Sequence, residues 1–384
     1  MQIKPFNIMV FPNGPRCNMD CKYCYYKSKT ALYDSKSEIK LSHELLETFI
    51  KDYMSIHPGI NIPFIWQGGE PTLRGLKFFK DAVSLQKKYL PAGKRFFNSF
   101  QTNGIKLNEK WIQFFKKENF LVGLSLDGPE NIHKHYRTDK NGNTNYNKII
   151  KNLNLLQKYN VDTNILCVVN NLNIKKPIEI YDFFKSLKVD YIQFIPLVEL
   201  NKSGYSINPN EYAKFLIKIF DKWIKDDYGE IHIQIFEEIL NAWFNGNTNI
   251  CYLSEECGNS MVLEHNGDLY SCDHYVNEKN KLGNIKKTSL QTLVSSPKQE
   301  EFGKRKSKNL SKKCYKCKYY FICHGGCLKN RQPNNGNINY LCKGYKKIFK
   351  HTEPYMKKIV YEIQNKKSTS EIKIELTKYF NEIQ

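Results

Sequence analysis

The residues in this chain best suited to chemistry are three cysteines near its N-terminus, Cys17, Cys21 and Cys24, spaced C-x3-C-x2-C. A structural metal site usually closes its shell with four protein ligands, whereas a reactive site keeps one position open. Three thiolates on a [4Fe–4S] cluster leave one iron without a protein ligand, and that iron can bind a small molecule. The spacing therefore predicts a reactive iron–sulfur site, and half of a zinc site is the alternative for these three cysteines alone.

The three cysteines follow an apolar, strand-like run at 6–11. In this setting they resemble the motif of the radical S-adenosylmethionine (radical SAM) superfamily, whose open iron chelates the amino and carboxylate groups of SAM. The segment Gln67-Gly68-Gly69-Glu70-Pro71 resembles that superfamily's Gly-Gly-Glu-Pro motif, which holds the SAM amino group. Adjacent glycines let a ligand approach the backbone, and carbonyl oxygens with Glu70 suit an ammonium group. An ordinary turn is the alternative for this segment alone.

The elements that must position these motifs alternate between strand and helix patterns along the first 200 residues. Apolar, β-branched or aromatic runs predict six strands, at 6–11, 62–66, 96–100, 121–126, 163–169 and 191–196. Segments with helical periodicity separate them, so the chain is expected to form βα units around a parallel sheet. The resemblance implies an α/β fold with a partial (β/α)6 radical SAM barrel, and a doubly wound sheet is the structural alternative. In either fold, functional residues gather at the C-terminal ends of strands.

Polar residues at these strand ends are candidates for SAM contacts. Ser125 and Asp127 are two residues apart on an extended segment, so both can face ribose hydroxyls, although Asp127-Gly128 is also an ordinary turn. By position, Arg137 resembles the superfamily's arginine on the SAM carboxylate; a surface arginine is the alternative. The resemblance also implies an adenine contact for the aromatic residue before the third cysteine and for an apolar residue after the sixth strand. The expected SAM-binding residues are Tyr23, Gly69, Ser125, Arg137 and Leu197.

A second set of eight cysteines lies beyond residue 250; Cys251 comes first, and the other seven follow the pattern C-x9-G-x4-C, C-x2-C-x5-C-x3-C and a final C. Two zinc ribbons are the alternative for such a set. The spacing resembles the SPASM domain, which carries auxiliary clusters in many radical SAM enzymes. The resemblance implies two further [4Fe–4S] clusters, three in all, each of the two with four cysteine ligands. These ligands would be Cys251, Cys257, Cys272 and Cys327 for the first, and Cys314, Cys317, Cys323 and Cys342 for the second. The twelfth cysteine, Cys167, is expected to be a small core residue.

The sequence around Cys272, and the runs at 323–327 and 339–345, resemble the anaerobic sulfatase-maturating enzymes. Those enzymes oxidise a Cys or Ser in a sulfatase Cys/Ser-x-Pro/Ala-x-Arg segment to Cα-formylglycine, releasing 5′-deoxyadenosine and methionine. Asp273 matches the family's proposed base, and a carboxylate hydrogen-bonded in a turn is the alternative. The implied partners are an unfolded or nascent sulfatase and a low-potential electron donor such as flavodoxin or ferredoxin. A SPASM-type enzyme that crosslinks or epimerises a ribosomal peptide is the second enzymatic interpretation.

These motifs predict a radical SAM barrel at 1–235, a SPASM domain at 236–350 and a helical tail at 351–384. Net charge is +21, from 59 Lys and Arg against 38 Asp and Glu, which leaves RNA binding open as a different class of function. Lysine is spread along the whole chain, so nucleic acid is not the expected partner. No run approaches 18 consecutive apolar residues, and Met1–Pro15 does not match a signal peptide. With twelve cysteines, the expected location is the cytoplasm, without a membrane partner.

Overall fold

A computed structural model describes residues 4–33, 39–200 and 204–383. The chain divides into two compact units, each built from separate stretches of sequence. The first unit comprises Met1–Ser125, Lys134–Thr163 and Cys257–Arg305. The second comprises Leu126–His133, Asn164–Glu256 and Lys306–Gln384. The predicted domains, with boundaries at residues 235 and 350, are continuous stretches of sequence, whereas these units are not. The predicted boundaries therefore stay predictions.

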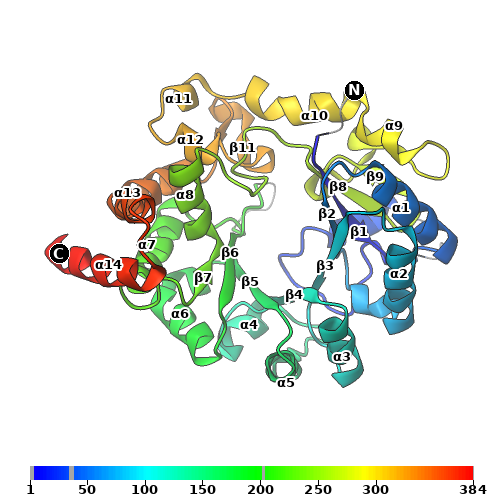
Figure 1. Cartoon of the computed structure of the whole chain (residues 1–384), viewed down its shortest axis with the longest axis horizontal. Helices are drawn as coiled ribbons and strands as arrows, with labels where there is room; N and C mark the ends of the chain where they lie inside the picture. The colour runs from blue at the N-terminus through cyan, green and yellow to red at the C-terminus, as the bar shows by residue number, and fades with distance from the viewer. Residues whose placement is uncertain (1–3, 34–38, 201–203, 384) are drawn as a thin grey trace. The chain divides into compact units, whose positions relative to one another are not determined.

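Four parallel strands form the centre of the first unit (Figure 1). They are paired in chain order, and α1, α2 and α3 each connect one strand to the next, as the sequence predicts for βα units. Ser42 starts α1 by accepting a hydrogen bond from the Leu45 amide, and α1 packs its apolar face against α2. The bounds are β1 (Asn7–Phe11), α1 (His43–Ile56), β2 (Asn61–Trp66), α2 (Leu76–Tyr89), β3 (Arg95–Thr102), α3 (Glu109–Lys117), β4 (Phe120–Ser125) and α5 (Tyr146–Lys158).

The cysteine-rich part of the chain adds three strands to this same sheet, which the sequence did not predict. β8 (Ser260–Glu264) lies parallel to β1, with Asn7 opposite Ser260 and Phe11 opposite Glu264. β9 (Asp268–Tyr270) and β10 (Lys281–Asn284) continue from it as antiparallel strands. The turn between β8 and β9 is therefore brought to the residues that follow β1, and a Cβ on Gly14 would lie 2.7 Å from the His265 Nδ1.

The second unit has three parallel strands, β5 (Thr163–Val169), β6 (Tyr191–Pro196) and β7 (His232–Ile233). Its helices pack mainly against α7, which is contacted by α6, α13 and α14 (Figure 1). Gly344 allows the start of α13 to approach α7, because a Cβ there would lie 2.3 Å from the Pro209 carbonyl oxygen. The helix bounds are α6 (Pro177–Ser186), α7 (Pro209–Asp226), α8 (Gln234–Asn245), α13 (Cys342–Gln364) and α14 (Thr369–Ile383).

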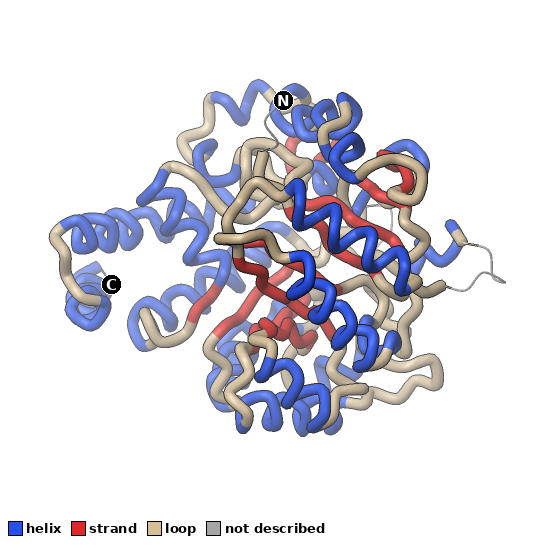
Figure 2. The backbone as a smooth tube through the Cα atoms, turned by 45° about the vertical axis from the view of Figure 1, so that its right-hand side comes forward, coloured by secondary structure: helices blue, strands red, loops and turns tan. Residues whose placement is uncertain are grey.

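Most of the remaining elements are short, and loops join them (Figure 2). The helices and strands are α4 (Glu130–Tyr136), α9 (Leu290–Val294), α10 (Pro297–Lys308), α11 (Lys312–Tyr315), α12 (Tyr320–Cys323), β11 (Arg331–Gln332) and β12 (Ile338–Asn339). The 3-10 turns are η1 (Lys27–Leu32), η2 (Pro71–Arg74), η3 (Asn173–Lys175), η4 (Asp273–Tyr275), η5 (Glu278–Asn280), η6 (Leu328–Asn330) and η7 (Pro333–Asn335).

All six predicted strands are present within one or two residues of their expected bounds. The helical tail is confirmed as well, but its helix begins earlier than expected, at Cys342. The densest basic stretch, 304–308, is the end of helix α10, and Lys306 in it is fully buried. Among the described residues, no helix is both long and apolar enough to cross a membrane.

Candidate active site

The loop that carries Cys17, Cys21 and Cys24 follows the C-terminal end of β1. Its backbone is held by two hydrogen bonds, from the Asp20 amide to the Thr138 carbonyl (2.7 Å) and from the Lys22 amide to the Tyr136 carbonyl (2.9 Å). These bonds connect the cysteine loop to the segment that contains Arg137. The structure thus places the first cysteine motif at the strand edge where the sequence predicts the chemistry.

The three thiols of this loop interact with one another. Burial raises the pKa of Cys17 to about 12, and the negative charges of Glu70, Cys21 and Cys24 add to the effect. The amides of Met19 and Asn103 donate weakly to the Cys17 sulfur, at 3.3 and 3.7 Å. Three mutually repelling thiolates are stable only beside a strong positive charge, because a bound metal deprotonates its thiol ligands. The donor set therefore fits an iron–sulfur cluster.

Glu70 is the centre of a buried hydrogen-bond network that joins two of the predicted motifs. Its Oε1 accepts from the Thr72 amide (3.0 Å), the Thr72 hydroxyl (2.6 Å) and the Thr102 hydroxyl (2.8 Å), and its Oε2 accepts from the Asn103 amide (2.9 Å). With four protein donors, this carboxylate braces the ends of β2 and β3 against each other. The sequence suggested that the Glu70 carboxylate accepts hydrogen bonds from an ammonium ligand. Because this carboxylate already has four protein donors, backbone carbonyls of the same segment suit that role better.

Gly69 packs directly against the cysteine loop. A Cβ at this position would lie 2.0 Å from the carbonyl oxygen of Arg16 and 2.5 Å from its carbonyl carbon. The Gly69 amide donates to the Gly14 carbonyl (2.8 Å), and the Glu70 amide donates to the Arg16 carbonyl (2.8 Å). The sequence suggested that a ligand approaches the backbone of Gly69 closely. In the structure, the backbone of Arg16, the residue before Cys17, makes this close approach.

We expect Gly69→Ala to displace the cysteine loop, because the clash at 2.0 Å involves backbone that cannot rotate away. Reconstituted protein should then hold less iron and bind SAM more weakly, while the rest of the fold is retained. Gly142→Ala is the matched control: its φ of +81° strains an alanine, but a Cβ meets no atom within 4 Å. Iron content and equilibrium dialysis with SAM measure both variants. Wild-type values for Gly69→Ala would contradict the packing role.

Two of the predicted SAM-binding residues lie in contact. Arg137 is buried, and its Nη1 donates to the Tyr23 hydroxyl at 3.0 Å. Burial argues against the surface-arginine alternative. Ser125, at the end of β4, accepts a hydrogen bond from Gln101 Nε2 at 3.0 Å. Leu197 belongs to the second unit, where it is buried after β6 and its amide donates to the Val169 carbonyl.

The environment of Asp127 differs from the one that the sequence predicts for a residue that contacts the ribose. It is fully buried in the second unit, and its Oδ1 accepts from the Val168 amide at 3.1 Å. Its backbone is engaged too, because the Asn173 side chain donates to the Asp127 carbonyl. This carboxylate stabilises the end of β5, which is a structural role.

Asp273 lies next to the first cysteine motif. Its Oδ2 accepts a hydrogen bond from the Tyr25 hydroxyl at 2.6 Å, and Tyr25 directly follows Cys24. Its Oδ1 accepts from the Cys272 thiol at 3.3 Å. Burial alone would raise the pKa of Asp273, but the charge of His274 and the bonds from Tyr25 and Cys272 outweigh it and lower the pKa. Asp273 is therefore ionised at neutral pH and can accept a proton.

Tyr25 is a site residue that sequence reasoning missed. Its ring lies 4.8 Å from that of His274, and burial raises its pKa well above the usual value, with further contributions from Asp273 and Cys24. The hydroxyl therefore stays protonated as a donor to Asp273. Tyr25 and Cys24 pack on an apolar cluster from β1, β8 and β9 that includes Phe11, Val262 and Tyr270. Only the β1–β8 pairing, which joins segments about 250 residues apart, could have revealed this contact.

Four cysteines of the second set gather in the second unit. Cys314, Cys317, Cys323 and Cys342 all line one cavity of about 80 Å³. Burial raises the pKa of Cys323 to about 12, and the charges of the other three cysteines contribute. Four thiols that line one cavity, with three of them raising the pKa of Cys323, are close enough together to hold one cluster. This set fits the grouping that the SPASM resemblance implies.

The other four predicted ligands are divided between the two units. Cys257 and Cys272 lie in the first, and Cys251 and Cys327 in the second. Within the second unit, the Cys251 segment is held by the buried Lys306, whose Nζ donates to the Cys251 carbonyl (3.1 Å) and the Tyr252 carbonyl (3.2 Å). Among the described residues, no group of His, Cys, Asp and Glu is arranged to hold a single metal ion.

Comparison with known proteins agrees with these motifs. A family model for the radical SAM superfamily matches residues 13–184, and the SPASM model, an iron–sulfur cluster-binding domain, matches residues 245–318. The serine-type anaerobic sulfatase-maturating enzyme of Bacteroides thetaiotaomicron is 39% identical over 96% of this chain and 94% of its own length. The cysteine-type enzyme of Clostridium novyi is 36% identical over 94% of this chain and 97% of its own.

A solved structure is similar over nearly the whole chain. Native anSMEcpe with bound AdoMet and Cp18Cys peptide superposes with a TM-score of 0.86, at 33% identity, over 94% of this chain and 100% of that one. The fold is thus an α/β radical SAM domain followed by a SPASM domain, with a helical C-terminal part, and the chain is a radical SAM enzyme. Within that class, it belongs to the family of anaerobic sulfatase-maturating enzymes.

Proposed function

We propose that this protein oxidises a Cys or Ser side chain in a sulfatase Cys/Ser-x-Pro/Ala-x-Arg segment to Cα-formylglycine, releasing 5′-deoxyadenosine and methionine. The observation that carries the proposal is the 2.6 Å hydrogen bond between Asp273 and Tyr25, which joins an ionised carboxylate to the cysteine loop. Family membership supports it. Relatives of the serine and the cysteine type have similar identity, so the proposal includes both substrates.

Residues near the first cysteine motif would hold the cofactor. Tyr23 and Arg137 form one contact pair, Gly69 fixes the backbone beside Cys17, and Ser125 lies at the end of β4. Leu197 would add an apolar surface for the adenine. Cys17, Cys21 and Cys24 would hold the cluster, which together with bound SAM would supply the radical chemistry that removes a hydrogen atom from the substrate Cβ.

Asp273 would accept the proton of the substrate thiol or hydroxyl. Tyr25 holds its Oδ2, which fixes the orientation of the carboxylate. Oδ1 now accepts from the Cys272 thiol, but a cysteine that binds a metal is deprotonated and donates no hydrogen bond. Cluster ligation by Cys272 would therefore free Oδ1 for the substrate proton.

Eleven cysteines would hold three [4Fe–4S] clusters in the sets that the resemblance implies. The two with four ligands have no open iron and would conduct the electron released by the substrate. The partners would be an unfolded or nascent sulfatase and a low-potential donor such as flavodoxin or ferredoxin. Thiolate ligands of this number suit the reducing cytoplasm.

The test is anaerobic incubation of reconstituted protein with SAM, dithionite and matched peptides containing Cys-x-Pro-x-Arg or Ser-x-Pro-x-Arg. Mass spectrometry should show aldehyde in at least one peptide and 5′-deoxyadenosine in equal amount. A crosslinked or epimerised peptide would instead favour the ribosomal-peptide alternative. Cleavage of SAM with neither peptide changed would contradict the proposed substrate.

A further inference from the structure

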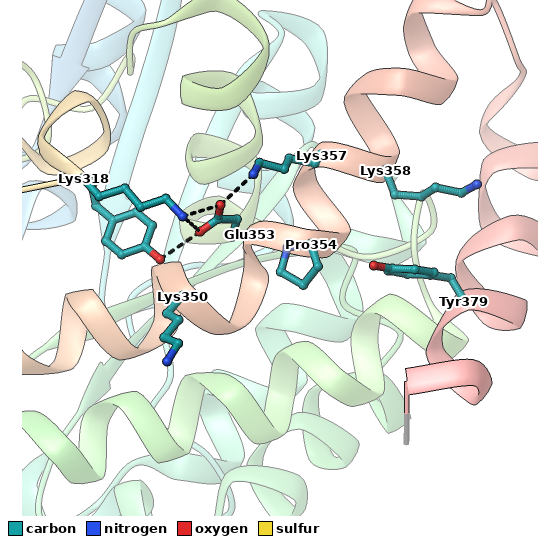
Figure 3. A pocket seen from close by; sticks show the side chains of 8 residues that line it. Lys318, Lys350, Glu353, Pro354, Lys357, Lys358 and Tyr379 are labelled. Atoms are coloured by element: carbon teal, nitrogen blue, oxygen red, sulfur yellow. Dashed lines mark hydrogen bonds and ion pairs between the residues drawn. The ribbon is translucent and has the colours of Figure 1, made fainter.

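The surface beside the second auxiliary cysteine set is strongly basic. Residues 312–358 contain twelve Lys and Arg and one acidic residue, Glu353. Part of this excess surrounds an open groove of about 590 Å³ on helix α13 (Figure 3). We call it the lysine groove; its lining residues are Lys318, Tyr319, Lys350, Glu353, Pro354, Lys357, Lys358 and Tyr379.

Glu353 organises the groove. Its carboxylate is bonded by Lys318 (2.7 Å), Lys357 (2.7 Å) and the Tyr319 hydroxyl (2.9 Å). The hydrogen bonds from Lys318 and Lys357 lower the pKa of Glu353 to about 2, so it stays charged. Lys358 instead pairs with Glu362 (2.8 Å). One carboxylate cannot neutralise the remaining three ammonium groups, and the side chains of Lys318 and Lys357 remain 62% and 57% exposed. The groove therefore presents net positive charge to solvent.

The groove shares a wall with the cysteine cavity. Tyr319 lines both, and Lys318 directly follows Cys317 in the chain. Helix α13 begins at Cys342, lines the cavity with Lys346 and Phe349, and then lines the groove with Lys350 and Lys357. A molecule bound in the groove would thus lie one side chain away from the cavity of Cys314, Cys317, Cys323 and Cys342.

We propose that the lysine groove is the docking site of an acidic one-electron carrier protein that exchanges electrons with the cluster held by the adjacent four cysteines. This inference rests on the proposed function, in which the substrate Cβ radical gives up one electron. That electron reduces the carrier, which arrives in its oxidised form, and the cluster returns to its oxidised state. Charge complementarity steers such encounters and speeds association. The alternative occupant of a basic groove, RNA, has no need of a nearby redox centre.

The test compares two variants with the same charge change in the reconstituted enzyme. Lys350→Glu, Lys357→Gln and Lys358→Gln together lower the charge by four and leave Lys318 on Glu353. Lys110→Glu with Lys148→Glu lowers it equally at exposed positions of the first unit. The probe is an oxidised acidic flavodoxin, and stopped-flow or surface plasmon resonance gives association rates at several salt concentrations. The groove variant should associate about tenfold or more slowly at low salt, and the control near the wild-type rate.

Equal effects of both variants would overturn the docking site, because only overall charge would then matter. Tight, salt-resistant RNA binding that the groove variant loses would also overturn it in favour of nucleic acid. Iron content checks that the clusters are intact, and Lys350→Glu alone is the fallback variant, with about half the effect on the logarithm of the rate. The aldehyde assay tests the proposed function independently of the groove. If the proposed function is wrong, the wild-type enzyme with dithionite makes no aldehyde, whatever the groove binds.

Discussion

Replacing Cys17, Cys21 and Cys24 together by alanine should abolish SAM cleavage and remove about four of about twelve irons from the reconstituted protein. Those three thiols are the only ligands proposed for the reactive cluster, and the charges of Cys21 and Cys24 contribute to the raised pKa of Cys17. The other eight cysteines stay in place, so about eight irons should remain. Iron and sulfide analysis, with 5′-deoxyadenosine measured by chromatography, checks both expectations.

Cys167→Ala is the matched control, because Cys167 is a buried core residue of β5 and is not a proposed ligand. It should keep the full iron content and SAM cleavage, with a modest loss of stability. Equimolar zinc and little iron in wild-type protein purified without oxygen would contradict the cluster assignment and restore the zinc-ribbon alternative.

The fold was predictable where the information is local. The six strands and their intervening helices follow from apolar runs and helical periodicity, and the motif residues at 67–71 follow from their place at the end of a strand. Gly69 was recognisable as a close-approach position, because only glycine lacks a Cβ. Which backbone approaches it, that of Arg16, was not visible in the sequence.

The rest depends on contacts between distant segments. Nothing in the run 260–264 indicates that β8 pairs with β1, and without that pairing Tyr25 is only an aromatic residue after a cysteine. Lys306 belongs to the basic run 304–308, yet it is buried against the carbonyls of the Cys251 segment. A lysine can be buried when fixed acceptors bind its ammonium group. Here the acceptors are backbone carbonyls, which every residue has, so no sequence pattern indicates them.

Asp273→Asn should separate radical generation from substrate oxidation. The change keeps the size of the side chain and an acceptor oxygen for the Tyr25 hydroxyl, but removes the basic carboxylate. Aldehyde formation should fall by about two to four orders of magnitude, the usual effect of losing a positioned base. Iron content and SAM binding should stay near wild type, and some 5′-deoxyadenosine should still form. Mass spectrometry of the peptide and chromatography of the nucleoside measure the two steps independently.

Two further variants sharpen this test. Glu278→Gln, at an exposed carboxylate five residues along the same segment, should leave every measurement unchanged. Tyr25→Phe removes the hydroxyl that orients Asp273, and a hydrogen bond to a charged acceptor contributes about 1.5–3 kcal/mol, so aldehyde formation should fall about 10- to 160-fold. If Asp273→Asn loses iron, Asp273 is a structural residue of the Cys272 loop. If it forms aldehyde at the wild-type rate, another group removes the proton of the substrate.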